Sequence, residues 1–324
     1  MKRKLISIIN ILILIIISFL VIYFFKPKTV IKDRSKIHVV ATIFPNYDFA
    51  KKIGGDRAEV SLLLESGVES HTYEPSPKDM IKIEQSDIFI YTGDEFEAWA
   101  KNIFSSINSP LEVVDTSKNI SLINIEEFEE KNINSEIIQD EEHDEHHINH
   151  EESSFDSHIW LNPQNAVIMI DDCLNAFCKF DPKNSEYYKN NAENYKKEIL
   201  NLDTRFENLV SNSNRNELAF AGEFAYTYFI DRYNLKFISV YNNCGEGQEP
   251  SIAKVKSVID YINNYKLPVV FYEELSEGTV AKMIDSETEA KSLVFYSLHN
   301  GNVEKDSYVS LMEQNYKVLE EALK

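Results

Sequence analysis

The segment that begins at Asp181-Pro182 constrains the fold more than any other part of the chain, because it carries a long, unbroken helical pattern. Asp181 suits a helix N-cap, and a proline at the next position suits the first helical turn. Beyond them, side chains of one helix face recur at steps of three and four residues: Tyr187, Tyr188, Asn191, Tyr195, Ile199, Leu202, Phe206 and Leu209. About 28 residues at 1.5 Å each form a rod of roughly 42 Å, so we predict a stiff linking helix over 181–212.

Strand-like and helix-like segments alternate on both sides of this helix. Predicted strands precede it at 36–44, 59–64, 87–91 and 111–114, and follow it at 217–221, 236–241, 269–272 and 292–296. Predicted helices lie at 46–54, 78–86, 225–233, 251–264, 279–286 and 308–323. Alternation of this kind is typical of parallel sheets covered by helices. We therefore expect two α/β lobes, over 37–180 and 213–324, joined by the linking helix.

Composition narrows the possible functions. The chain has 324 residues, 43% of them hydrophobic, which is enough for two well-packed cores. Its formal net charge of −20 argues against binding to nucleic acid, whose phosphates require clustered Lys and Arg. An acidic chain suits cation binding, although a solvated acidic surface is the simpler interpretation.

The N-terminal 36 residues contain a membrane-anchor pattern. Basic residues at 2–4 precede an apolar stretch over 5–25 that is interrupted only by Ser7, Asn10 and Ser18. About 21 residues at 1.5 Å each span roughly 31 Å, the thickness of a bilayer core. The residues after Phe25 are bulky and charged rather than small, so no signal-peptidase site is expected. We predict an uncleaved anchor and place the remaining chain on the extracytoplasmic side of the membrane.

Residues 126–152 form an acidic, histidine-rich tract within the first lobe. They include twelve Asp or Glu and one Lys, together with His143, His146, His147 and His150. No apolar spacing is evident there, so we expect a mobile loop. Such a loop can bind divalent cations weakly as an auxiliary site; the alternative is a solvated insertion without function.

Two further histidines lie in polar, proline-bounded segments far apart in the sequence. His71 lies within residues 65–79, and His158 lies in the run Asp-Ser-His-Ile-Trp-Leu-Asn-Pro over 156–163. Imidazole is the commonest metal ligand among side chains. Two such loops predict a metal site assembled between distant elements, rather than a local zinc finger.

These motifs resemble the substrate-binding proteins of zinc and manganese ABC importers, the zinc-uptake A-type or cluster A-I family. The resemblance covers roughly residues 37–324. It is carried by the run His-Thr-Tyr-Glu-Pro at 71–75, by Gly-Asp-Glu-Phe-Glu-Ala-Trp at 93–99 and by the run at 156–163. An acidic, histidine-rich insertion before the last run also occurs in many zinc-binding members.

The resemblance implies a metal site in the cleft between the lobes, with His71 and His158 as ligands from the first lobe. Glu223 occupies a position where the family often has histidine, and a glutamate there resembles the manganese-type members. Its alternative role is that of a helix-start residue favoured by the helix dipole. His299 follows the last strand, where many relatives have aspartate, and we prefer it to Glu273 as the fourth ligand because clefts in α/β folds collect ligands at strand ends.

The function that the resemblance implies is extracytoplasmic binding of Zn²⁺, with Mn²⁺ as the alternative, and delivery of the ion to the membrane permease of an ABC importer. The affinity should fall as histidine protonates below roughly pH 6. We expect a monomer with small lobe motions and no enzymatic activity. Two alternative functions are those of a surface adhesin and of a membrane-anchored metallohydrolase. Four protein ligands argue against the hydrolase, because catalytic zinc keeps an open coordination position.

Overall fold

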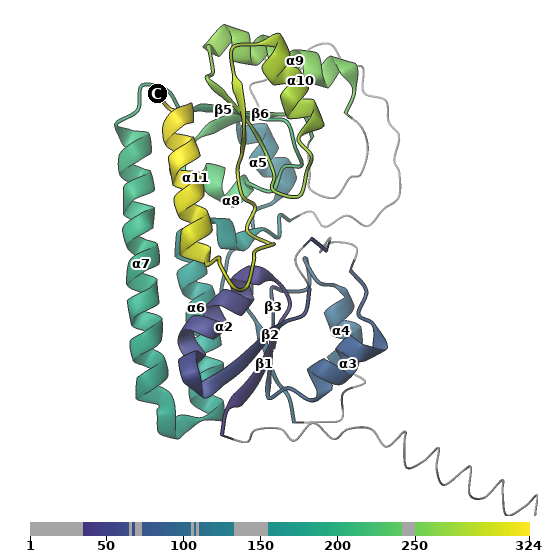
Figure 1. The fold of residues 1–324 in the computed structure, drawn as a ribbon, viewed down its shortest axis with the longest axis vertical. Coiled ribbons are helices and arrows are strands. Elements are labelled where there is room, and N and C mark those ends of the chain that lie inside the picture. Colours follow the sequence, from purple (N-terminus) through teal and green to yellow (C-terminus); the bar gives the residue numbers. More distant parts are fainter. Residues whose placement is uncertain are drawn as a thin grey trace, which may run out of the picture. The chain divides into compact units, whose positions relative to one another are not determined.

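Two parallel sheets organise the chain (Figure 1). The computed structural model describes residues 35–64, 67–68, 73–104, 107, 110–132, 155–241 and 250–324. The predicted anchor lies outside these residues. Among the described helices, none is both long enough and apolar enough to cross a membrane.

The two sheets have the same strand order. The first sheet runs β2-β1-β3-β4, and the second runs β6-β5-β7-β8, with every pairing parallel. The strands are β1 (Ile37–Ala41), β2 (Ala58–Leu62), β3 (Ile88–Tyr91), β4 (Glu112–Asp115), β5 (Glu217–Phe220), β6 (Lys236–Ser239), β7 (Val269–Tyr272) and β8 (Lys291–Val294). Strand β3 reads Ile-Phe-Ile-Tyr and is buried at every position, as expected for a parallel strand that is covered on both faces.

Helices cover the sheets and connect them. In the first lobe they are α2 (Phe44–Gly54), α3 (Pro77–Glu84), α4 (Trp99–Phe104) and α6 (Pro163–Phe180). Helix α5 (Ile125–Asn132) precedes α6 in the sequence but lies against the second lobe, where Lys131 pairs with Asp231 (Figure 1). The second lobe has α8 (Thr227–Tyr233), α9 (Ile252–Tyr265), α10 (Thr279–Glu287) and α11 (Tyr308–Ala322). Short 3₁₀ turns occur at Gly55–Arg57, Ile159–Leu161 and Pro182–Asn184.

The predicted linking helix is present as α7 (Ser185–Ser211), which has 27 residues. It packs against α2 and α6 of the first lobe and against α8 and α11 of the second (Figure 1). Its start differs from the prediction, because Pro182–Asn184 form a 3₁₀ turn first. Asp181 does not cap the helix; its Oδ2 accepts hydrogen bonds from the Tyr188 hydroxyl and from Asn184 Nδ2 instead. The expectation of two α/β lobes joined by a long helix is otherwise confirmed.

The prediction that residues 126–152 are entirely loop is wrong at its N-terminal end, where α5 forms. The Asn124 side chain accepts a hydrogen bond from Glu127 N and so caps the helix. One apolar side chain anchors the helix: Phe128 is buried and stacks on Phe237 at 5.8 Å between ring centroids. Sequence periodicity requires several apolar residues at regular steps. A helix that is anchored by one apolar residue is therefore not predicted from periodicity. Residues 133–154, including the four histidines of the tract, lie outside the described residues.

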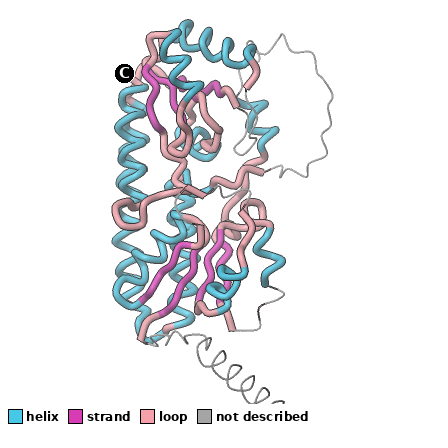
Figure 2. Tube along the Cα trace, turned by 45° about the vertical axis from the view of Figure 1, so that its right-hand side comes forward, coloured by secondary structure: helices cyan, strands magenta, loops and turns pink. Residues whose placement is uncertain are grey.

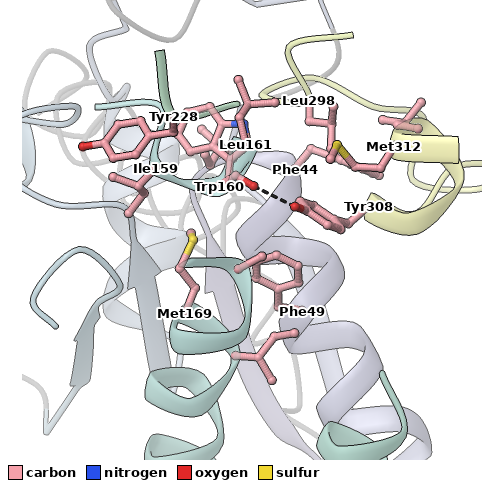
Figure 3. Close-up of a cluster of buried hydrophobic side chains, with 14 of the residues drawn as sticks. Phe44, Phe49, Ile159, Trp160, Leu161, Met169, Tyr228, Leu298, Tyr308 and Met312 are labelled. Atoms are coloured by element: carbon pink, nitrogen blue, oxygen red, sulfur yellow. Dashed lines mark hydrogen bonds between the residues drawn. The ribbon is translucent and has the colours of Figure 1, made fainter. Parts of the chain in front are cut away.

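The two lobes meet over a shared apolar core. One continuous cluster of buried side chains extends from the first sheet through α6, α7 and α11 into the second lobe. Trp160 lies at its centre, with Nε1 donating to Ser297 O at 2.8 Å and its own carbonyl accepting from the Tyr308 hydroxyl at 2.7 Å (Figure 3). Loop segments lie between the two sheets (Figure 2). The hydrogen bond from Trp160 to Ser297 connects the 3₁₀ turn Ile159–Leu161 to the loop that follows β8.

Candidate metal centre

His158 is held by the residue two positions before it. It stands immediately before the 3₁₀ turn Ile159–Leu161 and is 4% exposed. Asp156 Oδ1 accepts from His158 N at 2.7 Å and lies 3.1 Å from His158 Nδ1. Burial acts to raise the pKa of Asp156, but the attraction of His158 and the hydrogen bonds that Asp156 accepts outweigh it, and the pKa is lowered. An ionised Asp156 keeps the proton on Nδ1, which leaves Nε2 as the unprotonated nitrogen of the ring.

His299 is held in the same way from the second lobe. Its Nδ1 lies 2.8 Å from Ser297 Oγ, and that hydroxyl donates to Glu274 Oε1 at 2.9 Å. Because the hydroxyl proton is used by Glu274, Ser297 Oγ accepts the Nδ1 proton of His299. The Nε2 atom of His299 is then the nitrogen with the free lone pair. It is buried and has no hydrogen-bond partner in the described part of the chain.

The loop that carries His299 has an unusual backbone. Leu298 is fully buried and has φ of 66°, in the left-handed region that β-carbon-bearing residues rarely adopt. The flanking residues fix this conformation: Ser297 N donates to Glu274 Oε2 at 2.8 Å, and Phe44 N of the first lobe donates to His299 O at 3.3 Å. Such strain persists only where surrounding structure enforces it, and here it directs the imidazole toward the other lobe.

The structure brings His158 and His299 together. The two rings interact electrostatically, and His299 is 6% exposed. Burial, with the nearby His158 as a second cause, lowers the pKa of His299 to about 3. This imidazole is therefore neutral throughout the physiological range and has no proton to lose on binding a cation. Two imidazoles of opposite lobes, each with Nδ1 engaged, are donors of the type that zinc prefers.

Aromatic rings surround His158. Phe96 lies 5.9 Å from the His158 ring and 5.2 Å from Trp160, and Trp160 lies 5.3 Å from His158. Phe96 comes from the 93–99 run, which the sequence analysis singled out without a role. This run supplies an apolar wall that fixes the orientation of the imidazole.

The two candidate glutamates lie together beside His299. Glu223, Glu273 and His299 line one cavity of about 1000 Å³, bordered by α9 and α10. Burial, followed by repulsion from Glu223 and Glu274, raises the pKa of Glu273 to about 7. Glu273 also presses on Gly222, where an added β-carbon would lie 1.7 Å from Glu273 Oε2. A larger residue before Glu223 would therefore displace the Glu273 carboxylate.

The interpretation of Glu223 as a helix-start residue is wrong. Helix α8 begins at Thr227 rather than near Ala225, with Tyr226 at the N-cap position. Glu223 thus lies four residues before the helix, in the loop that follows β5. The favourable effect of a helix dipole on an acidic side chain is confined to the first turn.

Not all predicted ligands are described by the structure. His71, like His143, His146, His147 and His150, lies outside the described residues. Among the residues that are described, no three His, Cys, Asp or Glu side chains converge closely enough to hold a metal ion. The described part of the site is therefore the pair His158–His299, with Glu223 on the adjoining cavity wall.

The sequence analysis missed the residues that orient the histidines. Asp156 and Ser297 each precede their histidine by two positions, so the same spacing, Asp-x-His and Ser-x-His, occurs in both lobes. This shared spacing was available in the sequence. Glu274, which completes the second arrangement, is separated from Ser297 by 23 positions and becomes visible only in the fold.

Comparison with known proteins places the chain in a family. A family model described as "Zinc-uptake complex component A periplasmic" matches residues 39–322. The high-affinity zinc uptake system protein ZnuA of Bacillus subtilis is 32% identical over 293 residues, covering 89% of this chain and 88% of that protein. The zinc-binding protein AdcA of Streptococcus pyogenes is 28% identical over 325 residues, but the match spans only 60% of AdcA.

A solved structure agrees with the fold. The metal-dependent lipoprotein YcdH of Bacillus subtilis superposes with a TM-score of 0.72 at 29% identity, covering 89% of this chain and 99% of that one. The resemblance drawn from the sequence is thus confirmed, and so is the expectation that the chain is not an enzyme. The chain belongs to the family of periplasmic zinc-uptake components, ZnuA.

Proposed function

We propose that this protein captures one Zn²⁺ outside the cytoplasm, between its two lobes, and delivers it to the permease of an ABC importer. The proposed ligands are His71 and His158 from the first lobe and Glu223 and His299 from the second. Three imidazoles and one carboxylate form a closed, four-coordinate set of the kind that binds zinc without catalysis.

One observation carries this proposal: His158 and His299, from opposite lobes, are both buried and near enough to interact electrostatically, and each has its Nδ1 atom engaged. Burying an imidazole nitrogen that has no partner is unfavourable, and His299 Nε2 is buried without a hydrogen-bond partner among the described residues. A cation that accepts this lone pair supplies the partner. Glu223, which lines the same cavity as His299, is the proposed carboxylate ligand, and His71 is the further first-lobe ligand that the sequence motif proposes.

Zinc is preferred to manganese because of the ligand chemistry as well as the family. Imidazole suits zinc, whereas manganese prefers carboxylate and carbonyl oxygen. Family membership supports zinc, and the single carboxylate, Glu223, is the feature that favours manganese. The test is the metal content of full-length protein purified without added metal, followed by competition between the two ions. Zinc at one equivalent per chain, resisting a large excess of manganese, supports the proposal; displacement by equimolar manganese refutes the preference.

Attachment to the membrane by residues 1–36 is part of the proposal. The apolar stretch over 5–25 and the absence of a cysteine near it support a peptide anchor rather than a lipid one. Intact-mass analysis of membrane-extracted protein should find these residues present. A mature N-terminus near Lys28 would refute the anchor.

The histidine-rich tract is proposed as an auxiliary, weaker zinc site. Deleting 133–152, which leaves α5 intact, should keep the tight equivalent in a zinc titration and remove the weaker ones. Loss of the tight equivalent would show that the tract supplies a primary ligand. An adhesin role is distinguished by the same titration, since adhesion alone does not require a tight zinc equivalent.

A further inference from the structure

Tyr228, in helix α8 of the second lobe, bonds to two backbone segments that precede the linking helix in the sequence. Its hydroxyl accepts from Ile123 N at 3.1 Å and donates to Asp156 O at 2.8 Å. These two segments also pair with each other, because Asp156 N donates to Ile123 O at 3.0 Å. Asp156 therefore has both its backbone N–H and its carbonyl engaged, and the partner of the carbonyl is a side chain of the second lobe.

Tyr228 is firmly held within its own lobe. It is 2% exposed, and its ring belongs to the buried cluster that also contains Ile159 and Trp160 (Figure 3). Further along α8, Arg232 Nε and Nη2 donate to the buried carboxylate of Asp203 in α7, at 3.1 and 2.6 Å. Burial raises the pKa of Tyr228, so its hydroxyl stays protonated and remains a donor. Tyr228 is thus the rigid partner of Asp156.

Asp156 in turn orients His158. Its Oδ1 accepts from His158 N at 2.7 Å and lies 3.1 Å from His158 Nδ1. The first residue of α8, Thr227, is hydrogen-bonded through its side chain to the same carboxylate. Helix α8 therefore holds Asp156 at two places, its carbonyl through Tyr228 and its carboxylate through Thr227. A carboxylate that is held in this way is less free to turn away from the imidazole that it orients.

We propose that Tyr228, with Thr227 beside it, is a positioning residue through which the second lobe holds Asp156 and so keeps the imidazole of His158 oriented for zinc. This inference rests on the function proposed above. It means that the second lobe orients a ligand of the first. Loss of a partner that orients a metal ligand typically lowers affinity 10- to 100-fold. We expect an effect near the lower end, because Tyr228 acts on His158 through Asp156.

The test is a double-mutant cycle on the full-length protein, with zinc affinity measured by chelator competition. Tyr228→Phe keeps the ring and removes the hydroxyl, and it should weaken zinc binding about 10-fold. In the Asp156→Ala background, the same substitution should have little further effect, because the carboxylate through which it acts is gone. Equal weakening in both backgrounds, or none in either, would overturn the proposal.

A second measurement follows His158 in the absence of metal. The nitrogen chemical shifts of its ring, recorded by NMR at about pH 8, where an exposed imidazole is neutral, report which nitrogen carries the proton. The wild type should show the Nδ1–H tautomer, and Tyr228→Phe should show a mixture of both tautomers. The same tautomer in both proteins would contradict the proposal. If the wild type binds no zinc tightly, the proposed function fails, while the tautomer measurement still tests Tyr228 by itself.

Tyr233→Phe is the matched control, because Tyr233 is a buried tyrosine of the same helix. Its hydroxyl donates to Asp203 Oδ1 at 2.9 Å, and Asp203 keeps both hydrogen bonds from Arg232 when that hydroxyl is removed. The control should retain wild-type zinc affinity and the Nδ1–H tautomer of His158. If it loses as much affinity as Tyr228→Phe, any weakening of α8 has the same effect, and the specific role of Tyr228 is wrong.

A further variant keeps the proposal testable should Tyr228→Phe fail to fold. Thr227→Val has nearly the same shape and removes the other hydroxyl that α8 directs at Asp156. It should also weaken zinc binding in the wild-type background and have little effect in Asp156→Ala. Wild-type affinity in Thr227→Val would then overturn the proposal.

Discussion

Ser297 Oγ lies 2.8 Å from His299 Nδ1, and this contact determines which nitrogen of His299 faces the cleft. The hydroxyl is itself oriented by Glu274, so a chain of two hydrogen bonds extends from a buried carboxylate to the imidazole. Partners of this kind hold the tautomer and raise the basicity of a metal-binding histidine.

Removing the Ser297 hydroxyl should weaken zinc binding without unfolding the protein. For Ser297→Ala we expect a loss of about 10- to 100-fold, measured by chelator competition, because the imidazole can then rotate or change tautomer. Ser297→Thr retains the hydroxyl and should remain near wild type. Ser276→Ala is the control, since Ser276 lines the same cavity as His299 but its hydroxyl accepts from Gly278 N. Equal affinity in Ser297→Ala and the control would show that the hydroxyl does not orient a ligand.

The corresponding change in the first lobe is Asp156→Asn. The amide oxygen still accepts a hydrogen bond, but the negative charge that favours an Nδ1–H tautomer in His158 is lost. Zinc affinity should fall by roughly 10-fold. The same titration checks it, with the melting temperature of the metal-free protein recorded alongside. A variant that melts as the wild type does and binds zinc equally well would exclude this role for Asp156.

Glu223 and Glu273 should behave differently although they share a cavity. Glu223→Gln is expected to weaken both zinc and manganese, and Glu223→His should shift the affinity ratio toward zinc, because imidazole is the softer ligand. Glu273→Gln should change neither affinity by more than about threefold, because Glu273 neither binds the metal nor orients a ligand in this assignment. The reverse pattern, with Glu273 as the sensitive position, would identify Glu273 as the fourth ligand in place of His299 or Glu223.

A separate prediction concerns the pH dependence of folding. Burial raises the pKa of Glu97, which is 1% exposed, to about 7, well above the 4.5 of an exposed glutamate. The folded state therefore holds this proton more tightly than the unfolded state. The resulting stability is complete below about pH 4.5 and is lost as pH rises through about 7.

Glu97→Gln should remove this dependence. The free energy of unfolding of metal-free wild type should fall between pH 5 and pH 8 by up to about 3 kcal/mol more than that of the variant. Urea denaturation at both pH values measures it, and Glu95→Gln, at an exposed position in the same run, is the control. If the free energy of unfolding changes equally with pH in the wild type and in Glu97→Gln, the pKa of Glu97 is not raised by folding and the prediction is wrong.

Sequence reasoning succeeded where a pattern is long and local. The apolar strands and the repeat along 187–209 predicted both sheets and α7, because each depends on the period of its own segment. It failed where one contact determines a helix or its first residue. Helix α5 depends on the stacking of Phe128 on Phe237. The start of α7 is later than predicted, and there the Tyr188 hydroxyl donates to Asp181. The motif resemblance supplied His158, Glu223 and His299 as candidates. It could not supply Glu274, because its partner Ser297 is distant in sequence.

The most direct test of the account is a zinc titration of full-length, metal-free protein alongside His158→Ala and His299→Ala. Two ligands from opposite lobes should each be indispensable, so the wild type should bind one tight equivalent. Each variant should lose at least about 100-fold in affinity while its metal-free form melts near the wild-type temperature. One tight equivalent retained in both variants would contradict the assignment of the interlobe site.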